Sequence, residues 1–175
     1  MNIKNALNLL DKELKIIDEK REITICGCAS LNLQKYTDRA TQDVDVISPK
    51  IDLTFQKAVS VVAIILNTNL DWLNDNAYSV SEILLPDWEK RLDLIYKGQN
   101  LSVFSISRID LITSKLDAMA NRDRDLFDLV SMRPNDQELE TASTHLKFLQ
   151  DTDGYSKWLD RCVFKIKERR DKTDD

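Results

Sequence analysis

The sequence predicts a mixed α/β (α+β) fold, in which a small β-sheet with flanking helices is followed by a helical C-terminal region. Segments of strand character alternate with helical periods up to residue 105, and only helical periods follow. Gly and Pro number three each among 175 residues, which disfavours an all-β fold that depends on many tight turns. A chain of this length can bury about 70% of its unfolded surface, so its core requires no disulfide or structural metal.

The elements expected in the first 105 residues build the sheet and the helices that cover it. Apolar residues at spacings of three and four predict a helix over 3–19, and an apolar run predicts a second helix over 53–67, buried nearly all round. A short helix is expected over 29–36. Strands, the last two joined by a turn at Gly98, are predicted over 22–27, 43–48, 79–85, 91–97 and 101–105.

The remaining residues show helical signals only. Ser107 and Asp110 have the spacing of a capping box, and a helical period follows them. Asn135 is a candidate N-cap after Pro134. Further helices are expected over 123–132, 135–149 and 153–169. We therefore divide the chain into an α/β core at 1–105, a helical region at 106–168 and a charged tail at 169–175 that should fray.

Composition excludes several kinds of chemistry. The single histidine, His145, excludes zinc sites built on several imidazoles. Three cysteines without a secretory signal segment indicate reduced thiols and no disulfide-linked partner. No apolar run approaches the roughly 20 residues of a membrane span, so we expect a soluble, cytoplasmic protein. Thirty Asp and Glu against 25 Lys and Arg disfavour a broad nucleic-acid surface and favour catalysis with carboxylates and a hard cation.

The most informative stretch is a glycine-containing turn followed by two aspartates on the next strand. Asp43 and Asp45 should project from one face of the strand, while Val44 and Val46 enter the core. Two neighbouring carboxylates repel each other, and both stay ionised at little cost in free energy when a cation lies between them. Gly27 ends the preceding strand, where a glycine permits close backbone approach and a helix N-terminus offers N–H groups to a phosphate. This combination is typical of metal-assisted phosphoryl or nucleotidyl transfer.

These motifs resemble the DNA-polymerase-β-type nucleotidyltransferase superfamily, in which a Gly-Gly or Gly-Ser turn precedes Asp-hydrophobic-Asp. The chain is more closely similar to bacterial stand-alone members, including the abortive-infection AbiEii toxin type and related uncharacterised families. The resemblance covers roughly residues 20–132. It is carried by Gly27-Cys-Ala-Ser-Leu31, Arg39-Ala-Thr-Gln-Asp-Val-Asp45, Ser114-Lys-Leu116 and Arg122-Asp-Arg-Asp-Leu-Phe-Asp128.

The resemblance implies roles for individual positions. Asp43 and Asp45 would hold Mg²⁺ on the triphosphate, in a site of the two-metal type. Asp93 would be a third carboxylate for the metal and would help to deprotonate the acceptor hydroxyl. The residues expected to line, contact or support the nucleotide site are Gly27, Cys28, Ser30, Arg39, Thr41, Lys115 and Asp125.

Other interpretations of these residues stay open. Asp93 also fits an exposed strand residue paired with Arg91 or Lys97, and Lys115 fits a solvated helix lysine. The charged run at 122–128 also fits a solvated face or a lattice of Arg–Asp pairs. Cys28 occupies the place of the second Gly or Ser of the turn motif, and its thiol is a poorer donor to phosphate than a hydroxyl.

Two functional hypotheses result. The first is a Mg²⁺-dependent enzyme that moves a nucleoside monophosphate from a nucleoside triphosphate to a hydroxyl acceptor, with an RNA end or a protein as the acceptor. Analogy with the AbiEii type adds a toxin role and a partner protein. The second is a catalytically degenerate nucleotidyltransferase scaffold that binds a nucleotide or a partner protein. A purely structural α/β protein is a third interpretation, which applies if the aspartate pair binds no cation.

Overall fold

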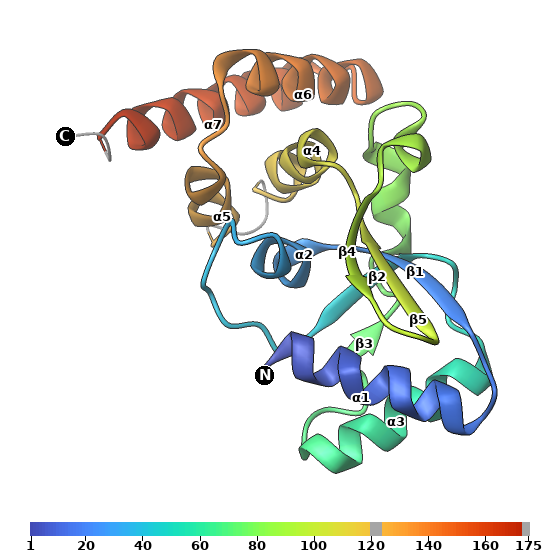
Figure 1. Ribbon diagram of the computed structural model, residues 1–175. Helices are drawn as coiled ribbons and strands as arrows, with labels where there is room; N and C mark the ends of the chain where they lie inside the picture. Colours follow the sequence, from blue (N-terminus) through green and yellow to red (C-terminus); the bar gives the residue numbers. More distant parts are fainter. Residues whose placement is uncertain (120–123, 173–175) are drawn as a thin grey trace. The chain divides into compact units, whose positions relative to one another are not determined.

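One mixed sheet organises the first hundred residues in the computed structural model, which describes residues 1–119 and 124–172. Within the described part, five strands follow the order β3-β2-β1-β5-β4 (Figure 1). The central strand β1 (Arg21–Cys26) pairs in parallel with β5 (Leu101–Ser105) and antiparallel with β2 (Val44–Ser48). The edge strands are β4 (Asp93–Lys97), which forms a hairpin with β5, and the two-residue β3 (Leu73–Asn74). This confirms the predicted α+β class.

Packing divides the chain into two units. The first comprises Met1–Ser81 with Glu89–Ile106 and contains the sheet, whereas the second comprises Glu82–Trp88 with Ser107–Asp175 and is helical. None of the described helices combines the length and the apolar character needed to cross a membrane.

Two helices supply the apolar layer that covers the sheet. They are α1 (Ile3–Ile16) and α3 (Leu53–Leu66), which pack against each other and run in opposite directions (Figure 1). Their buried side chains share one core with apolar residues of β1, β2 and β5, and this core includes Leu7, Leu10, Val44, Val46, Val59, Val62 and Val103. Val44 and Val46 are therefore in the core, as predicted from the two-residue period of a strand.

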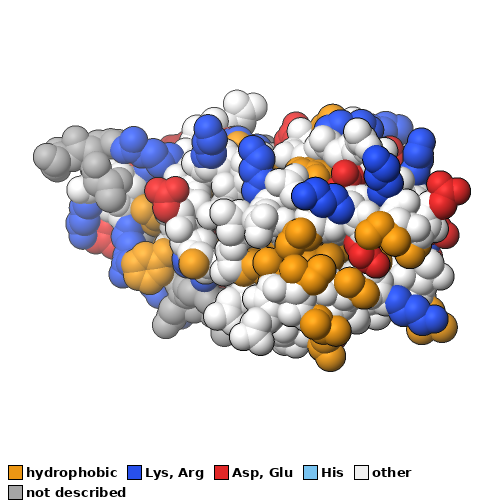
Figure 2. Space-filling view, turned by 60° about the horizontal axis from the view of Figure 1, so that its bottom comes forward, with side chains coloured by type: hydrophobic (Ala, Val, Ile, Leu, Met, Phe, Trp, Pro, Cys, Tyr) orange, Lys and Arg blue, Asp and Glu red, His pale blue; other side chains and the backbone are white. Residues whose placement is uncertain are grey.

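The prediction for α3 is correct in type and wrong in burial. Its inner residues are buried, but Leu53 is 82% exposed and Ile64 is 73% exposed. Figure 2 shows hydrophobic side chains gathered on the side of the molecule that α1 and α3 form. An apolar run that extends around a helix does not reveal which faces find a partner, because that depends on packing.

The central strand also differs from its expected pattern. Four consecutive residues of β1, from Ile23 to Cys26, are buried, whereas a strand with one solvent-exposed face alternates between buried and exposed residues. Strands β2 and β5 pair with the two edges of β1, and the burial of successive residues shows that both faces of the strand are covered there.

One predicted strand is absent and one strand was missed. Residues 79–85 were expected to be a strand, but Tyr78–Ile83 forms a 3₁₀ helix, followed by a second at Trp88–Arg91. The strand β3 at Leu73–Asn74 was not predicted, because two residues provide no period to detect. Residues 79–85 were compatible with either conformation, and none of the described strands pairs with them.

The second unit contains α4 (Arg108–Ala118), α5 (Arg124–Met132), α6 (Asp136–Leu149) and α7 (Asp153–Lys172). The predicted caps are confirmed: Ser107 accepts a hydrogen bond from the backbone of Asp110, and Asn135 forms a full capping box with Glu138. Helix α7 extends into the segment expected to fray, and Arg170 pairs with Asp136 there at 3.0 Å. Residues 173–175 lie outside the described residues.

Asp11 links α1 to the hairpin between β4 and β5. Its carboxylate accepts hydrogen bonds from the backbone N–H groups of Gln99 at 3.3 Å, Asn100 at 2.7 Å and Leu101 at 2.8 Å. A side chain at Gly98 would collide with this carboxylate, since a Cβ there would lie 2.2 Å from Asp11 Oδ1. The glycine of the predicted turn therefore permits the close approach of helix and hairpin.

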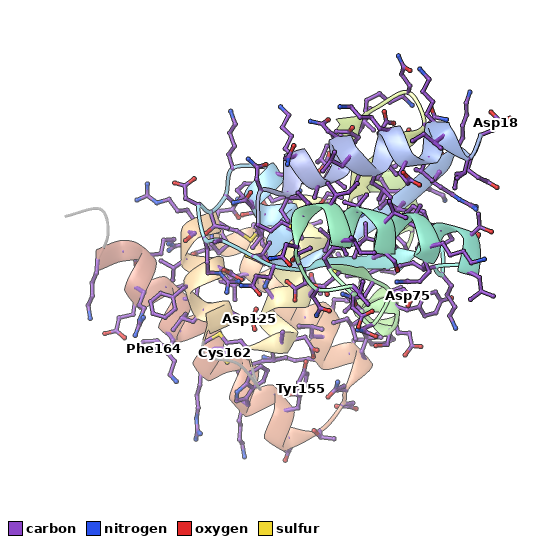
Figure 3. All side chains as sticks on the ribbon, turned by 90° about the horizontal axis from the view of Figure 1, so that it is seen from below. Asp18, Asp75, Asp125, Tyr155, Cys162 and Phe164 are labelled. Atoms are coloured by element: carbon purple, nitrogen blue, oxygen red, sulfur yellow. The ribbon has the colours of Figure 1, made fainter. Side chains whose placement is uncertain are left out.

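We predict that Asp11→Asn lowers the free energy of unfolding by about 1.5–3 kcal/mol, because the hairpin N–H groups lose a charged acceptor. Asp18→Asn is the matched control, since Asp18 is exposed beyond the end of α1 (Figure 3) and its substitution should change stability by less than about 0.5 kcal/mol. Urea denaturation of both variants measures the difference. Equal losses in the two variants would show that the Asp11 contacts contribute little.

Candidate active site

The turn after β1 and the carboxylate of Asp45 are in close contact. Antiparallel pairing places Asp45 opposite Cys26, the last residue of β1, so that Asp45 faces the turn that begins helix α2 (Gly27–Leu33). Gly27 has φ +71°, and a Cβ built on it would lie 2.6 Å from Asp45 Oδ2. Both the backbone conformation and the available space therefore require glycine at this position. The pairing brings together two of the residues that the sequence singled out.

The second carboxylate is held by its own loop. Asp43 is exposed and directly precedes β2, and the hydroxyl of Thr41 donates a hydrogen bond to Asp43 Oδ1 at 2.6 Å. Thr41 is itself anchored, because its carbonyl accepts a hydrogen bond from the N-terminal ammonium of Met1 at 3.2 Å. In this structure, Thr41 thus orients Asp43.

The other turn residues differ in accessibility. Ser30 is fully buried, and its hydroxyl shares a hydrogen bond with Ser105 and accepts another from Gln34 at 3.2 Å. It therefore does not reach the surface of the turn, where the resemblance placed it. Cys28 is half-buried, with its Sγ 3.8 Å from the carbonyl oxygen of the half-buried Arg39.

The sheet does not bring Asp93 to this turn. Asp93 pairs with Ser105 of β5, and β5 in turn pairs with β1, so that two strands separate Asp93 from β2. Three inter-strand steps correspond to about 14 Å, much more than a shared metal ion can bridge. The side chain of Asp93 is exposed on the edge strand. The order of strands decides this separation, and no sequence motif encodes it.

The donor set at the turn consists of carboxylate oxygens, which suit a hard cation. Across the described residues, no group of three His, Cys, Asp or Glu side chains is arranged to hold a metal ion. The predicted set of Asp43, Asp45 and Asp93 is therefore not assembled. The first two carboxylates still fit Mg²⁺, which proteins usually bind through one or two carboxylates while substrate phosphates and water complete its ligands.

Lys115 and Asp125 meet in the second unit. Lys115 Nζ lies 2.7 Å from both Asp125 Oδ1 and Asp128 Oδ2, and each of these aspartates is 1% exposed (Asp125 is labelled in Figure 3). Burial alone would lower the pKa of Lys115, but hydrogen bonds and charges from the two carboxylates outweigh it, so its pKa is raised. The ammonium therefore stays charged until the pH exceeds the ordinary lysine value of about 10.4.

This buried cluster differs from the sequence-based interpretation in two ways. Lys115 is 8% exposed and is not a solvated helix lysine. Asp128 belongs to the cluster although it was not among the candidate site residues, and its spacing of three from Asp125 on one helix was the available signal. Of the quoted charged motif, Arg122 and Asp123 lie outside the described residues.

We predict that Gly27→Ala destabilises the protein by at least about 1–2 kcal/mol and displaces the Asp45 carboxylate, since alanine adds strain at positive φ and a Cβ at 2.6 Å from Oδ2. Gly154→Ala is the control, because a Cβ there meets nothing within 4 Å, and a helical alanine should leave stability unchanged or slightly raised. Denaturant unfolding compares the two variants. A Gly27→Ala protein as stable as Gly154→Ala would refute the tight contact.

We predict that Lys115→Met lowers the free energy of unfolding by about 3–5 kcal/mol at neutral pH, because two buried carboxylates lose their counter-ion. The loss should shrink as the pH rises through the raised pKa of Lys115, because the parent protein then loses the same counter-ion. Lys147→Met, which removes an exposed pair with Asp160, should cost at most about 1 kcal/mol. Denaturation at several pH values tests both expectations, and a small, pH-independent loss in Lys115→Met would contradict them.

Comparison with known proteins extends the argument. The sequence profile of a family described as a nucleotidyltransferase of unknown function (DUF6036) matches residues 5–138. The matched region includes the Gly27 turn, Asp43, Asp45 and the Lys115 cluster. No curated protein and no solved structure matches the chain. Because the match spans about three quarters of its length, the chain belongs to the DUF6036 nucleotidyltransferase family.

Proposed function

We propose that this protein transfers a nucleoside monophosphate from a nucleoside triphosphate to a hydroxyl group, with Mg²⁺ as cofactor. The observation that carries the proposal is the contact between Gly27 and Asp45, in which a carboxylate lies against a turn that only glycine can form. Family membership supplies the class of reaction. The pair of aspartates supplies the chemistry that this class requires.

The reaction balances without a further reactant. The acceptor hydroxyl oxygen forms a bond to the α-phosphorus, and the bond from that phosphorus to the bridging oxygen of the β-phosphate breaks. Pyrophosphate leaves, and the hydroxyl proton passes to solvent. Mg²⁺ would neutralise charge on the phosphates during this displacement.

The roles that we assign to the chain follow from the geometry of its first unit. Asp43 and Asp45 would hold the metal ion, and Thr41 orients Asp43 through its hydroxyl. Gly27 leaves open the space beside Asp45 Oδ2 that a side chain would fill. We assign no metal-binding role to Asp93, because two strands lie between it and β2. A phosphate contact by Lys115 stays a prediction, and its ammonium is already bound by two carboxylates.

The proposal also includes an acceptor class and a biological role. An RNA end or a protein hydroxyl is the acceptor class, and a toxin regulated by a partner protein is the role that the similarity to the AbiEii type suggests. Both acceptor classes can be tested with α-labelled triphosphates, because only the α-phosphorus is transferred. A γ-labelled triphosphate serves as the control, since its label leaves with pyrophosphate.

Cys28 favours a second candidate function, a scaffold that binds a nucleotide or a partner protein without turnover. Its thiol occupies the position where the superfamily motif has Gly or Ser. The sulfur lies near the Arg39 carbonyl oxygen, and a thiol is a weaker hydrogen-bond donor than the hydroxyl group of a serine. Nucleotide binding without transfer, with transfer gained in Cys28→Gly, would establish this alternative.

We predict that Mg²⁺ with the preferred nucleoside triphosphate raises the midpoint of thermal unfolding by about 5–10 °C at a ligand concentration near 100 times Kd. Asp45→Asn should abolish this shift and reduce transfer at least about 100-fold, since it removes a charged metal ligand. Asp38→Asn is the matched control, because it makes the same change at an exposed position of the preceding loop.

Differential scanning fluorimetry with each triphosphate, with and without EDTA, measures the shift. Transfer of an α-phosphorus label measures the reaction. Full transfer by the Asp45→Asn protein would overturn the proposed site. If no triphosphate shifts the parent protein and no label is transferred, the proposed function fails.

A further inference from the structure

An apolar surface on α3 is not explained by the fold or by the proposed reaction. Four side chains on one side of the helix are exposed, with exposed fractions of 82% for Leu53, 37% for Val61, 73% for Ile64 and 59% for Ile65. At 100° per residue they fall within an arc of about 120°. We name these four residues the α3 face. Figure 2 shows the hydrophobic side chains gathered on this side of the molecule.

The α3 face lies away from the candidate active site. The inner side of α3 packs in the core with Val44 and Val46 of β2. Successive strand residues point to opposite faces of the sheet, so Asp45 projects on the other face, toward Gly27. A molecule bound on the α3 face would therefore leave the Gly27 turn open.

The size of the α3 face matches what a stable homodimer requires. The exposed fractions together amount to about two and a half complete aliphatic side chains, or roughly 450 Å² of apolar surface. A standard interface buries about 800 Å² per partner, of which about 56–65% is apolar, so its apolar part is also roughly 450–520 Å². Polar neighbours of the face on α3 would supply the rim.

The α3 face is also complementary to itself when two copies of α3 run antiparallel. A two-fold axis near Val61 places Lys57, about 6 Å along the helix, level with Ile65 of the partner's α3. The aliphatic stem of Lys57 then covers Ile65, and its ammonium reaches the C-terminal turn of the partner's helix. That turn carries no basic side chain of its own, and a cation there favours the helix dipole.

We propose that two copies of this chain associate through their α3 faces as an antiparallel, two-fold symmetric pair. The interface buries Val61, Ile64 and Ile65 at its centre, and Lys57 of each copy lies at the C-terminal end of the other copy's α3. The two candidate active sites face away from the interface and act independently.

Sedimentation velocity of the full chain over a wide concentration range tests the proposal. We expect the parent protein to have twice its chain mass of 20.2 kDa at high concentration. Ile64→Lys should weaken association at least roughly tenfold, because a charge would be buried at the centre of the interface. Phe148→Lys is the control, since Phe148 is an 83% exposed side chain on α6, outside the α3 face, and its substitution should leave the dimer intact.

Lys57 tests the antiparallel arrangement. Lys57→Glu should weaken the dimer, because it places a carboxylate at the partner's helix C-terminus, whereas Lys57→Arg should retain it. Circular dichroism checks that each variant is folded, and Ile65→Lys replaces Ile64→Lys if the latter unfolds.

A monomer mass for the parent at every concentration overturns the proposal, as does a dimer that survives both isoleucine substitutions. A dimer whose association is unchanged by Lys57→Glu overturns the antiparallel arrangement. Mg²⁺-triphosphate binding measured on Ile64→Lys should equal that of the parent, so failure of the dimer and failure of the proposed function are distinguishable.

Discussion

The register between β1 and β2 is the constraint on which the candidate site depends. Pairing of Cys26 with Asp45 places the carboxylate directly against the turn at Gly27. A shift by one residue would point Asp45 into the core and Val44 toward the turn, because successive strand side chains face opposite sides. The buried valines on either side of Asp45 oppose such a shift, since each would leave the core. Core packing thus fixes the position of Asp45 in the candidate site.

The two faces of the sheet differ in the first unit. On one face, α1 and α3 bury the apolar side chains that stabilise the fold. On the other, the half-buried Asp45 lies against the turn between β1 and α2, and the exposed Asp43 directly precedes β2. The polar groups that are buried near this turn satisfy one another, as the hydroxyls of Ser30 and Ser105 do with the amide of Gln34. These buried hydroxyls therefore incur no penalty for unpaired polar groups.

The second unit relies on a buried ionic contact. Lys115 of α4 binds Asp125 and Asp128 of α5, so that the contact ties together two helices that are consecutive in the chain. Buried ion pairs are costly to assemble, and removing one member leaves an uncompensated charge. The contact therefore specifies how α4 and α5 pack more than it adds stability.

The sequence by itself was sufficient to predict the fold class, most element positions and the caps at Ser107 and Asn135. It was also sufficient to single out the motif of Gly27, Asp43 and Asp45. These features depend on neighbouring residues and on strand or helix periods. Only the tertiary structure decided what depends on partners distant in the chain. The strand order separates Asp93 from Asp45. Ser30 is buried beside Ser105, which belongs to the strand next to the central β1. Packing leaves one side of the apolar helix α3 exposed. A residue's type and spacing carry no information about which strand becomes its neighbour, since that choice is made by the packing of the whole core.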